Sequence, residues 1–509
     1  MTSTSALVVL LPLASCTSGD MEPSAPPDAA PDRAPGPWDL GVELPAAPPN
    51  HGDPRRGEWL LLNGDYMSCG LPYKLWNFPI VAGIVQQALG QGRPPMPGRS
   101  GKNADLPYSV NVFTTTDGAE VVNLNCLHCH GGYFDGELVV GLGDPTRDFT
   151  DGLIGAFPVD LVQSWMLSPL LGFTQAERDN TDILLHTARA IGDRTTTRTV
   201  GMNPADSLAR VLAEHRDPAT LAWSDAPLRE VVFYGDDGQP LADARFTSDP
   251  PPWWRVHKKH ALFYNGMTRG PHRGTMEAAS AICVDNLTEA ARIDALFEDI
   301  QAFVESVRTP RYPRHIDDAL AARGRVLFER DCAGCHGSYG DDPLADDTDT
   351  YPNLLIPLEV VGTDPVIAEV GTRHAANVFE VYNTTFYGQV TALHPGDPFP
   401  GYVPPPLDGI WATAPFLHNG SVPSVALVLD SKARPKYWKR VDYDSTHFDE
   451  ETLGWPYFEL PYGQAEAPAA ERKYVYDTTL WSQTRGGHTF GDGYSDAERR
   501  AVVEYLKTL

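Results

Sequence analysis

Basic side chains are scarce in this sequence of 509 residues. It has 40 Lys and Arg against 67 Asp and Glu, which gives a formal charge of −27 at pH 7. Nucleic-acid binders need Lys- and Arg-rich surfaces to meet phosphates, and anionic lipid headgroups attract the same side chains. The composition therefore argues against both kinds of partner. It favours instead a cationic redox or substrate partner, or none.

Long apolar runs are absent apart from one near the start. Residues 6–15 form an apolar run of ten, which is too short for the roughly 20 residues of a membrane helix but typical of a signal-peptide core. The run ends in Leu13-Ala14-Ser15-Cys16, which resembles the lipobox of bacterial lipoproteins, although no Lys or Arg precedes it. An ordinary secretory signal is the alternative. We expect residues 1–16 to be a lipoprotein signal peptide.

The same reading predicts where the protein resides. The mature chain should be extracytoplasmic, as a periplasm-facing or outer-membrane lipoprotein or one at the cell surface, and should meet the membrane only through its N-terminal lipid. Residues 17–57 contain many prolines and few large apolar residues. Such a segment cannot bury enough apolar surface to fold, so we expect a disordered tether.

Cysteine is also scarce, with seven in the chain. Four of them lie in two copies of the pattern C-x-x-C-H, namely Cys126, Cys129 and His130, and Cys332, Cys335 and His336. Positions i, i+3 and i+4 share one face of a helical turn. Two thiols placed in this way can form thioethers with the vinyl groups of one porphyrin, and the adjacent imidazole can bind its iron. The sequence therefore predicts two covalently bound c-type haems.

Two other uses of the motif cysteines are weaker. A zinc site would have to join pairs that lie far apart in the sequence, and a thioredoxin-like C-x-x-C would need a βαβ context. If Cys16 carries a lipid, Cys69 and Cys283 are left over. Two spare thiols in an oxidising compartment predict a disulfide between them, and two separate buried thiols are the alternative.

Methionine is absent after Met276. The haem at Cys332 therefore cannot take a downstream Met as its second axial ligand, and a His is the expected substitute. We favour His488, which follows two glycines that allow close backbone approach, and place His418 second. The haem at Cys126 has no equally clear partner. Its candidate ligands are Met166, Met202, Met267, Met276, His257, His260 and His272, and only if none of them binds is the iron open to a small ligand.

Helical patterns outnumber strand patterns. Residues 317–331 have helical spacing and run into Cys332, and the capping box Ser495–Glu498 precedes an apolar stripe that continues to the last residue. We predict a mainly α fold with two cytochrome c-like haem domains, residues 58–311 and 312–509, each with long irregular loops and insertions.

The segment between the two motifs is rich in aromatic and basic residues. Trp253 and Trp254 are candidates to lie between the haems and assist electron transfer, and Phe263 could pack on a porphyrin. Four nearby cationic residues could neutralise haem propionates: Lys258, Lys259, Arg269 and Arg273. A tryptophan-anchored core turn is the structural alternative.

Taken together, the two motifs, the Trp253-Trp254 segment, the loop APFLHNGSVPS at 414–424 and the ending GGHTF–YLKTL resemble exported di-haem c-type cytochromes. The similarity is to bacterial rubber oxygenases and, more distantly, to bacterial di-haem cytochrome c peroxidases. It implies an open iron with His130 as proximal ligand, a second iron held by His336 and a C-terminal His, and a tryptophan between the haems.

The function expected from this resemblance is an extracytoplasmic oxidoreductase. The first haem would activate O2 or peroxide, with an apolar substrate in the oxygenase case, and the second would be an electron reservoir. Peroxide cleavage would need a nearby acid or base, for which Glu277, His272 and His260 are candidates. The alternative is a non-catalytic electron-transfer lipoprotein with both irons six-coordinate.

Overall fold

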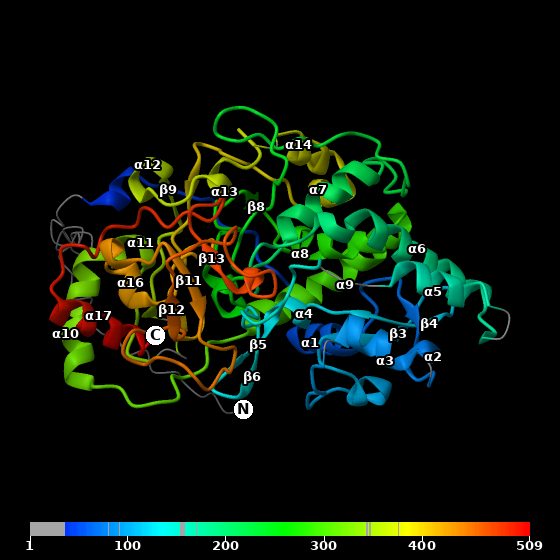
Figure 1. Ribbon diagram of the computed structural model, residues 1–509, viewed down its shortest axis with the longest axis horizontal. Helices are drawn as coiled ribbons and strands as arrows, with labels where there is room; N and C mark the ends of the chain where they lie inside the picture. Colours follow the sequence, from blue (N-terminus) through cyan, green and yellow to red (C-terminus); the bar gives the residue numbers. More distant parts are fainter. Residues whose placement is uncertain are drawn as a thin grey trace, which may run out of the picture.

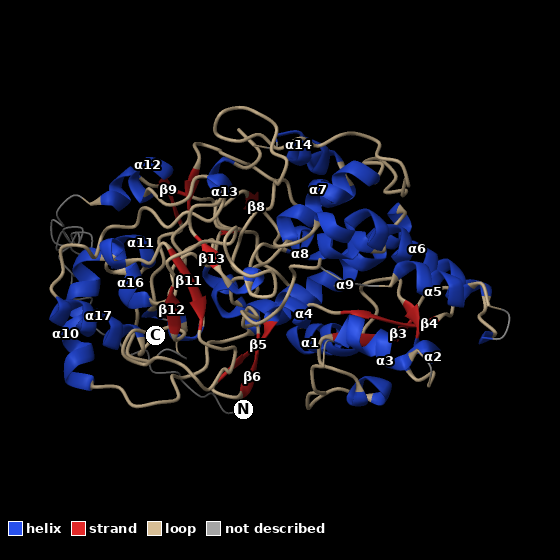
Figure 2. Ribbon diagram, in the orientation of Figure 1, coloured by secondary structure: helices blue, strands red, loops and turns tan. Residues whose placement is uncertain are grey.

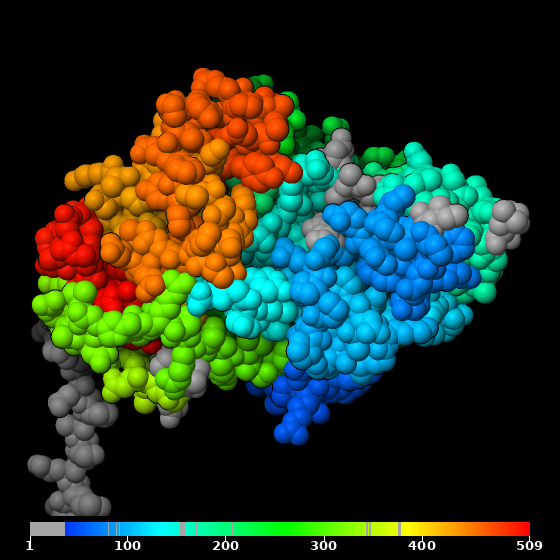
Figure 3. All heavy atoms as spheres, turned by 60° about the horizontal axis from the view of Figure 1, so that its bottom comes forward, coloured from blue at the N-terminus to red at the C-terminus, as the bar shows by residue number. Residues whose placement is uncertain are grey.

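Short helices and strands alternate with long loops along this chain (Figure 1). The computed structural model describes residues 36–79, 81–90, 92–152, 158–168, 171–342, 345, 348–374 and 376–509. The predicted signal peptide, Cys16 and the first part of the predicted tether lie outside these residues. In Figures 1 and 3, most of the N-terminal part (blue to cyan) and the C-terminal helix (red) lie at opposite ends of the molecule.

The α-helices are α1 Pro54–Asn63, α2 Tyr73–Trp76, α3 Ala82–Val85, α4 Leu127–His130, α5 Val159–Met166, α6 Gln175–Ile191, α7 Ala205–His215, α8 Arg273–Glu277, α9 Leu287–Ser306, α10 Asp318–Asp331, α11 Ala333–His336, α12 Leu358–Val361, α13 Val366–Glu369, α14 Ala376–Thr384, α15 Phe386–Val390, α16 Val425–Val428 and α17 Asp496–Leu506. The strands are β1 Val42–Glu43, β2 Leu71–Pro72, β3 Val110–Thr114, β4 Glu120–Leu124, β5 Gly131–Phe134, β6 Glu137–Val140, β7 Ala261–Leu262, β8 Thr268–Arg269, β9 Leu354–Pro357, β10 Gly401–Tyr402, β11 Tyr437–Arg440, β12 Tyr457–Glu459 and β13 Tyr476–Asp477.

The prediction of a mainly α fold is wrong. The structure is 38% helical and 12% strand, and its strands form several small antiparallel sheets, including β1-β9-β10, β12-β11-β13 and β2-β4-β3 (Figure 2). Most strands are too short to show a period of two. In β3 the first four residues are all buried, so the alternation that identifies a half-exposed strand is missing.

The packing joins the two expected haem domains closely. Phe134 and Leu142, which follow the first C-x-x-C-H motif, belong to the same buried cluster as Phe328 and Trp411 of the C-terminal part. Adjacent tryptophans divide between two cores, because Trp253 packs in the N-terminal cluster and Trp254 in the C-terminal one. The two parts of the chain therefore interlock around this tryptophan pair.

The N-terminal part is built around α9 and the β2-β4-β3 sheet. Helix α1 begins with Asp53, whose carboxylate accepts a hydrogen bond from the Arg55 backbone N–H at 2.9 Å. A disulfide joins Cys69 to Cys283, so the predicted pairing is confirmed. It connects the start of this part to the segment that precedes α9, and none of the four motif cysteines is in a disulfide.

The C-terminal part contains the two helices that the sequence predicts most clearly, and both are confirmed. Helix α10 leads into Cys332, and α17 begins at the Ser495–Glu498 capping box. The two helices cross closely at Gly324, where any side chain would collide with the Ala501 carbonyl. This contact fixes the second motif against the C-terminal helix.

Residues 36–57 belong to the folded body. A short 3₁₀ turn at Pro37–Leu40 leads into β1, which pairs with β9, and Leu44 is 2% exposed. The described part of the predicted tether therefore packs on the folded protein. The sequence does not predict this contact, because β1 pairs with a strand that is more than 300 residues away, and such a pairing leaves no local pattern. Among the described residues, no helix combines the length and apolarity that crossing a membrane requires.

Candidate haem-attachment sites

The first C-x-x-C-H motif forms one helical turn, α4, at the entrance to the β5-β6 hairpin. The Asn125 side chain fixes the turn, since its oxygen accepts from the Leu127 N–H at 2.9 Å and its amide donates to the Tyr108 carbonyl at 2.8 Å. The Cys126 backbone N–H donates to the Tyr66 hydroxyl at 3.0 Å. The turn therefore places Cys126, Cys129 and His130 on one helical face, as the spacing predicts.

Burial raises the pKa of three motif thiols, those of Cys126, Cys129 and Cys332, to about 12 for Cys129 and for Cys332. A redox-active dithiol or a thiolate metal ligand needs the opposite shift. These thiols are therefore protonated in the folded chain, which disfavours the thioredoxin-like use of either pair.

His130 and His128 point to different surroundings. The ring of His130 packs on Trp253, with ring centres 5.1 Å apart, and burial lowers the pKa of His130 to about 4. It is therefore a neutral imidazole at physiological pH, the form that binds a metal. His128 is 3% exposed and packs on Phe149 instead.

The second motif forms the turn α11, directly after α10. The Nδ1 of His336 donates to the Pro405 carbonyl at 2.8 Å. Because a carbonyl can only accept, this bond fixes the tautomer and leaves Nε2 free to bind a metal. The Tyr339 hydroxyl donates to the His336 carbonyl at 2.9 Å and accepts from the Leu407 N–H at 2.6 Å. The loop at residues 404–409 therefore holds the imidazole in place.

His488 faces His336. Their ring centres are 6.3 Å apart, with an angle of 53° between the ring planes. An iron that binds two imidazole nitrogens at about 2 Å each, with roughly 1 Å from each nitrogen to its ring centre, gives a separation of about 6 Å. Burial is the main cause that lowers the pKa of His488 to about 4. The pair therefore has the spacing and the protonation state of two axial ligands.

Arg434 holds the loop that carries His488. Its buried guanidinium donates to the carbonyls of Arg485, Gly487 and His488 at 2.8, 2.7 and 3.0 Å. The His488 N–H donates to the Val361 carbonyl at 2.7 Å, and His488 itself has a φ of +45°. No sequence motif marks Arg434, because its partners lie about 50 residues further along the chain.

His418, the second candidate ligand, lies in a different environment. Its Nε2 is 3.0 Å from the Tyr402 hydroxyl, and its ring stacks on the Tyr402 ring with centres 4.3 Å apart. Burial lowers the pKa of His418 to about 3. The nitrogen that would bind iron is therefore already paired with Tyr402.

The tryptophan pair connects the surroundings of the two motifs. Trp253 packs on His130, while the Trp254 indole N–H donates to the Asp408 carbonyl at 2.8 Å. Asp408 lies in the same loop as Pro405, the partner of His336. Phe263 lies in the turn between β7 and β8 and is 36% exposed, so it is not part of this buried contact.

Most of the cationic residues that were expected to face propionates have carboxylate partners. Lys258 pairs with Asp349 and Asp408 at 2.6 Å each, Arg269 with Asp397 at 3.0 Å, and Arg273 with Asp294 at 2.7 Å. Lys259 differs, because burial, reinforced by the nearby Arg255, lowers its pKa to about 7.

Arg255 is a residue that the sequence reading missed. It is 4% exposed, its Nε donates to the Asp408 carbonyl at 2.9 Å, and one terminal nitrogen is buried without a hydrogen-bond partner. A buried cationic nitrogen without an acceptor is costly. Together with the motif thiols, none of which is in a disulfide, and the neutral imidazoles, it fits a c-type haem whose propionates would supply the missing acceptor.

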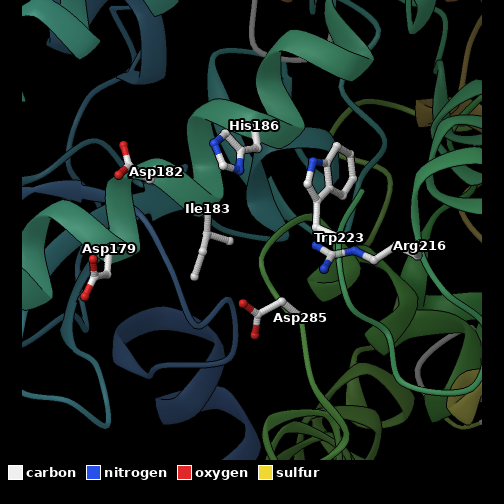
Figure 4. A pocket seen from close by; sticks show the side chains of 7 residues that line it. All are labelled: Asp179, Asp182, Ile183, His186, Arg216, Trp223 and Asp285. Carbon is white, nitrogen blue, oxygen red and sulfur yellow. The ribbon is translucent and has the colours of Figure 1, made fainter. Parts of the chain in front are cut away.

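A surface hollow lies away from these sites (Figure 4). Its lining residues come from α6 and from the loops after α7 and before α9: Asp179, Asp182, Ile183, His186, Arg216, Trp223 and Asp285. The lining includes three aspartates but none of the motif cysteines or candidate ligand histidines.

Comparison with known families identifies one segment. Residues 401–439 match a family described as RoxA-like, cytochrome c-like. The matched segment contains Pro405, which holds His336, and Arg434, which holds the His488 loop. The chain thus carries a cytochrome c-like segment that resembles the rubber oxygenase cytochromes, and a segment of this kind implies a c-type haem.

Two curated relatives extend the comparison beyond this segment. The uncharacterized protein y4iJ of Sinorhizobium fredii is 26% identical over 323 residues, covering 48% of this chain and 52% of the relative. The uncharacterized protein y4iM of the same organism is 24% identical over 298 residues, covering 51% of this chain and 64% of the relative. The chain therefore spans between about half and two thirds of these relatives.

Proposed function

We propose that the protein is an extracytoplasmic di-haem oxidoreductase in which the haem at Cys126 activates O2 or peroxide and the haem at Cys332 stores electrons. A bound haem supplies a one-electron centre and, where a coordination position is open, a site for a small oxidant. Cys126 and Cys129 would hold the first haem with His130 as proximal ligand. Cys332 and Cys335 would hold the second, with His336 and His488 as axial ligands.

The observation that carries this proposal is the contact of one short segment with both sites. Trp253 lies against His130, and the adjacent Trp254 and Arg255 both donate to Asp408, in the loop that fixes His336. Aromatic rings packed in contact give electrons a short path through protein. The segment therefore has the position that electron exchange between a reservoir haem and a reacting haem requires.

The first test replaces one tryptophan. Trp253→Phe keeps an apolar ring but changes the contact with His130, so we expect slower electron transfer between the haems with unchanged haem content and folding. Trp438→Phe is the matched control, because Trp438 is also buried and hydrogen-bonded, to the Ser421 carbonyl at 3.0 Å, but lies in another cluster. Equal rates in the wild type and Trp253→Phe would exclude Trp253 from the electron path.

Whether the first haem reacts with peroxide or with O2 depends on side chains that can act as a general acid or base. Peroxide cleavage needs such a group, and two buried candidates lie at α8: His272, 2% exposed with both ring nitrogens lacking hydrogen-bond partners, and Glu277, which is fully buried. Insertion of O2 into an apolar substrate does not need such an acid or base, so it would need neither His272 nor Glu277. Loss of peroxide turnover in His272→Gln would support the peroxidase reaction, and unchanged O2 uptake with an apolar alkene in the same variant would support the oxygenase.

His272 also favours the alternative function, an electron-transfer lipoprotein with both irons six-coordinate. Burial lowers the pKa of His272 to about 4, so the imidazole is neutral and able to bind iron. If His272 occupies the first iron, the ferric protein will show two low-spin haems and will not bind cyanide. Such a protein would relay electrons to a basic cytochrome drawn by the charge of −27.

The extracytoplasmic location is supported by the Cys69–Cys283 disulfide, because such bridges persist in oxidising compartments. A lipid on Cys16 would then tether the protein to a membrane. Mass spectrometry of the N-terminal peptide from a bacterial membrane fraction tests this, since an unmodified Cys16 or an uncleaved leader would contradict it.

A further inference from the structure

A second cluster of metal-ligating side chains lies outside the candidate haem sites. Asp236, Glu369 and His374 place two carboxylate oxygens and one imidazole nitrogen within 4.8 Å of one another. Glu369 ends α13, which lies in the upper part of Figure 1. Phe233 and Val366, which lie near these ligand residues in the sequence, belong to one buried cluster. This cluster is separate from the two clusters that contain Trp253 and Trp254.

His374 is oriented as a ligand. Its side chain is fully buried, its ring packs edge-on against Trp481 with ring centres 5.6 Å apart, and its Nδ1 donates to the Tyr234 carbonyl at 2.6 Å. Because Nδ1 carries the proton, Nε2 is the nitrogen left to bind. Metal-ligating histidines usually make such a bond through the other ring nitrogen.

The Nε2 of His374 has no hydrogen-bond partner, although it is buried. The nearest carboxylate oxygen, Oε2 of Glu369, is 3.5 Å away, which is longer than an ordinary N–H···O bond. Buried polar atoms in native proteins almost always have a partner, so an unpaired one needs an explanation. Two ligands of one ion stand at about this distance, since each lies about 2 Å from the metal.

The backbone holds the two segments together. The Tyr234 N–H donates to the His374 carbonyl at 3.4 Å, and the His374 N–H donates to the Glu369 carbonyl at 3.4 Å. The ligand atoms are therefore brought together by bonds that do not involve the ligand groups themselves, as a preorganised site requires.

Arg373 competes for the same carboxylates. Its guanidinium is 3.1 Å from Glu369 Oε2 and 4.0 Å from Asp236 Oδ1, and its side chain is 46% exposed. Exposed ion pairs of this kind are weak, so Arg373 can turn into solvent when a cation of higher charge binds. Two carboxylates and one guanidinium leave the cluster with a net negative charge.

We propose that Asp236, Glu369 and His374 bind one Zn²⁺ ion. One imidazole and two carboxylates suit Zn²⁺, whereas Ca²⁺ and Mg²⁺ prefer oxygen ligands alone. Three protein ligands leave a fourth position for water. The ion would link the loop at residues 234–236 to the end of α13 and supply the missing partner of the buried His374 nitrogen.

The test measures zinc binding to the haem-loaded, chelator-treated full chain, by equilibrium dialysis with elemental analysis, so that iron is counted separately. We expect one zinc per chain. Asp236→Asn should weaken zinc binding at least about tenfold. The Asp236 side chain is 63% exposed, so this substitution should leave folding intact. His374→Ala should abolish binding. His447→Ala is the control, because His447 pairs with Asp442 at 2.8 Å on the surface without a third ligand.

Arg373→Ala should change the zinc affinity in the opposite direction from these variants. It removes the competing cation and should tighten zinc binding, whereas a purely structural ion-pair network predicts no zinc in any variant. Absence of stoichiometric zinc from the wild type, or unchanged affinity in both Asp236→Asn and His374→Ala, would overturn the proposal. The readout does not depend on haem activity, so its failure leaves the proposed oxidoreductase function intact.

Discussion

Replacing Arg434 should loosen the second haem without touching its ligands. Arg434 is 3% exposed, and three of its hydrogen bonds end on the loop at residues 485–488. At about 1 to 1.5 kcal/mol for each net hydrogen bond, their loss removes about 3 to 4 kcal/mol from the binding of this loop. That corresponds to a factor of several hundred in the equilibrium between bound and released His488.

Cyanide affinity measures this equilibrium, because cyanide can bind the second iron only after His488 leaves. In Arg434→Met, which preserves the length of the side chain, we expect the affinity of the second haem for cyanide to rise by about two powers of ten or more. The bis-imidazole electron paramagnetic resonance signal identifies the haem that responds. Arg330→Met is the control, since Arg330 is 60% exposed and pairs with Asp331. Unchanged cyanide affinity in Arg434→Met would refute this account of how His488 is held.

Two further predictions concern single side chains. His488→Ala should convert the second haem from low-spin to high-spin in the optical spectrum. His418→Ala should not, because His418 already pairs with Tyr402. The reverse result would make His418 the ligand. Burial, reinforced by Asp294, raises the pKa of Glu277 to about 9. Between pH 4.5 and 9 the Glu277 carboxyl therefore stays protonated in the folded state, whereas in the unfolded state, where its pKa is near 4.5, it loses the proton. The free energy of unfolding therefore falls as the pH rises between about 4.5 and 9. Glu277→Gln should flatten that decline in chemical denaturation at pH 5 to 9, and an unchanged slope would contradict the shift.

Local patterns in the sequence predicted local structure well. Cys332 and His336 share a helical turn because the i, i+4 relation is a property of the helix alone. The capping box at Ser495 and the apolar stripe after it gave α17 for the same reason. The Cys69–Cys283 pairing followed from counting cysteines, since few pairings remained once the motifs were assigned.

Long-range contacts could not be predicted in this way. Val42 was placed in a tether, but β1 pairs with β9 through backbone bonds that any residue can make. His418 and His488 both sit in glycine-containing loops, and only the fold shows that one meets Tyr402 and the other faces His336. Arg434 carries no motif, because its role depends on carbonyls brought to it from elsewhere in the chain.

The most direct test of the central claim is electron paramagnetic resonance of the purified ferric protein, quantified per chain and titrated with cyanide. We predict two haems: one low-spin bis-imidazole signal that cyanide leaves unchanged, and one signal that cyanide converts. A single haem per chain, or two signals that both ignore cyanide, would contradict the account of one electron-storing and one reacting haem.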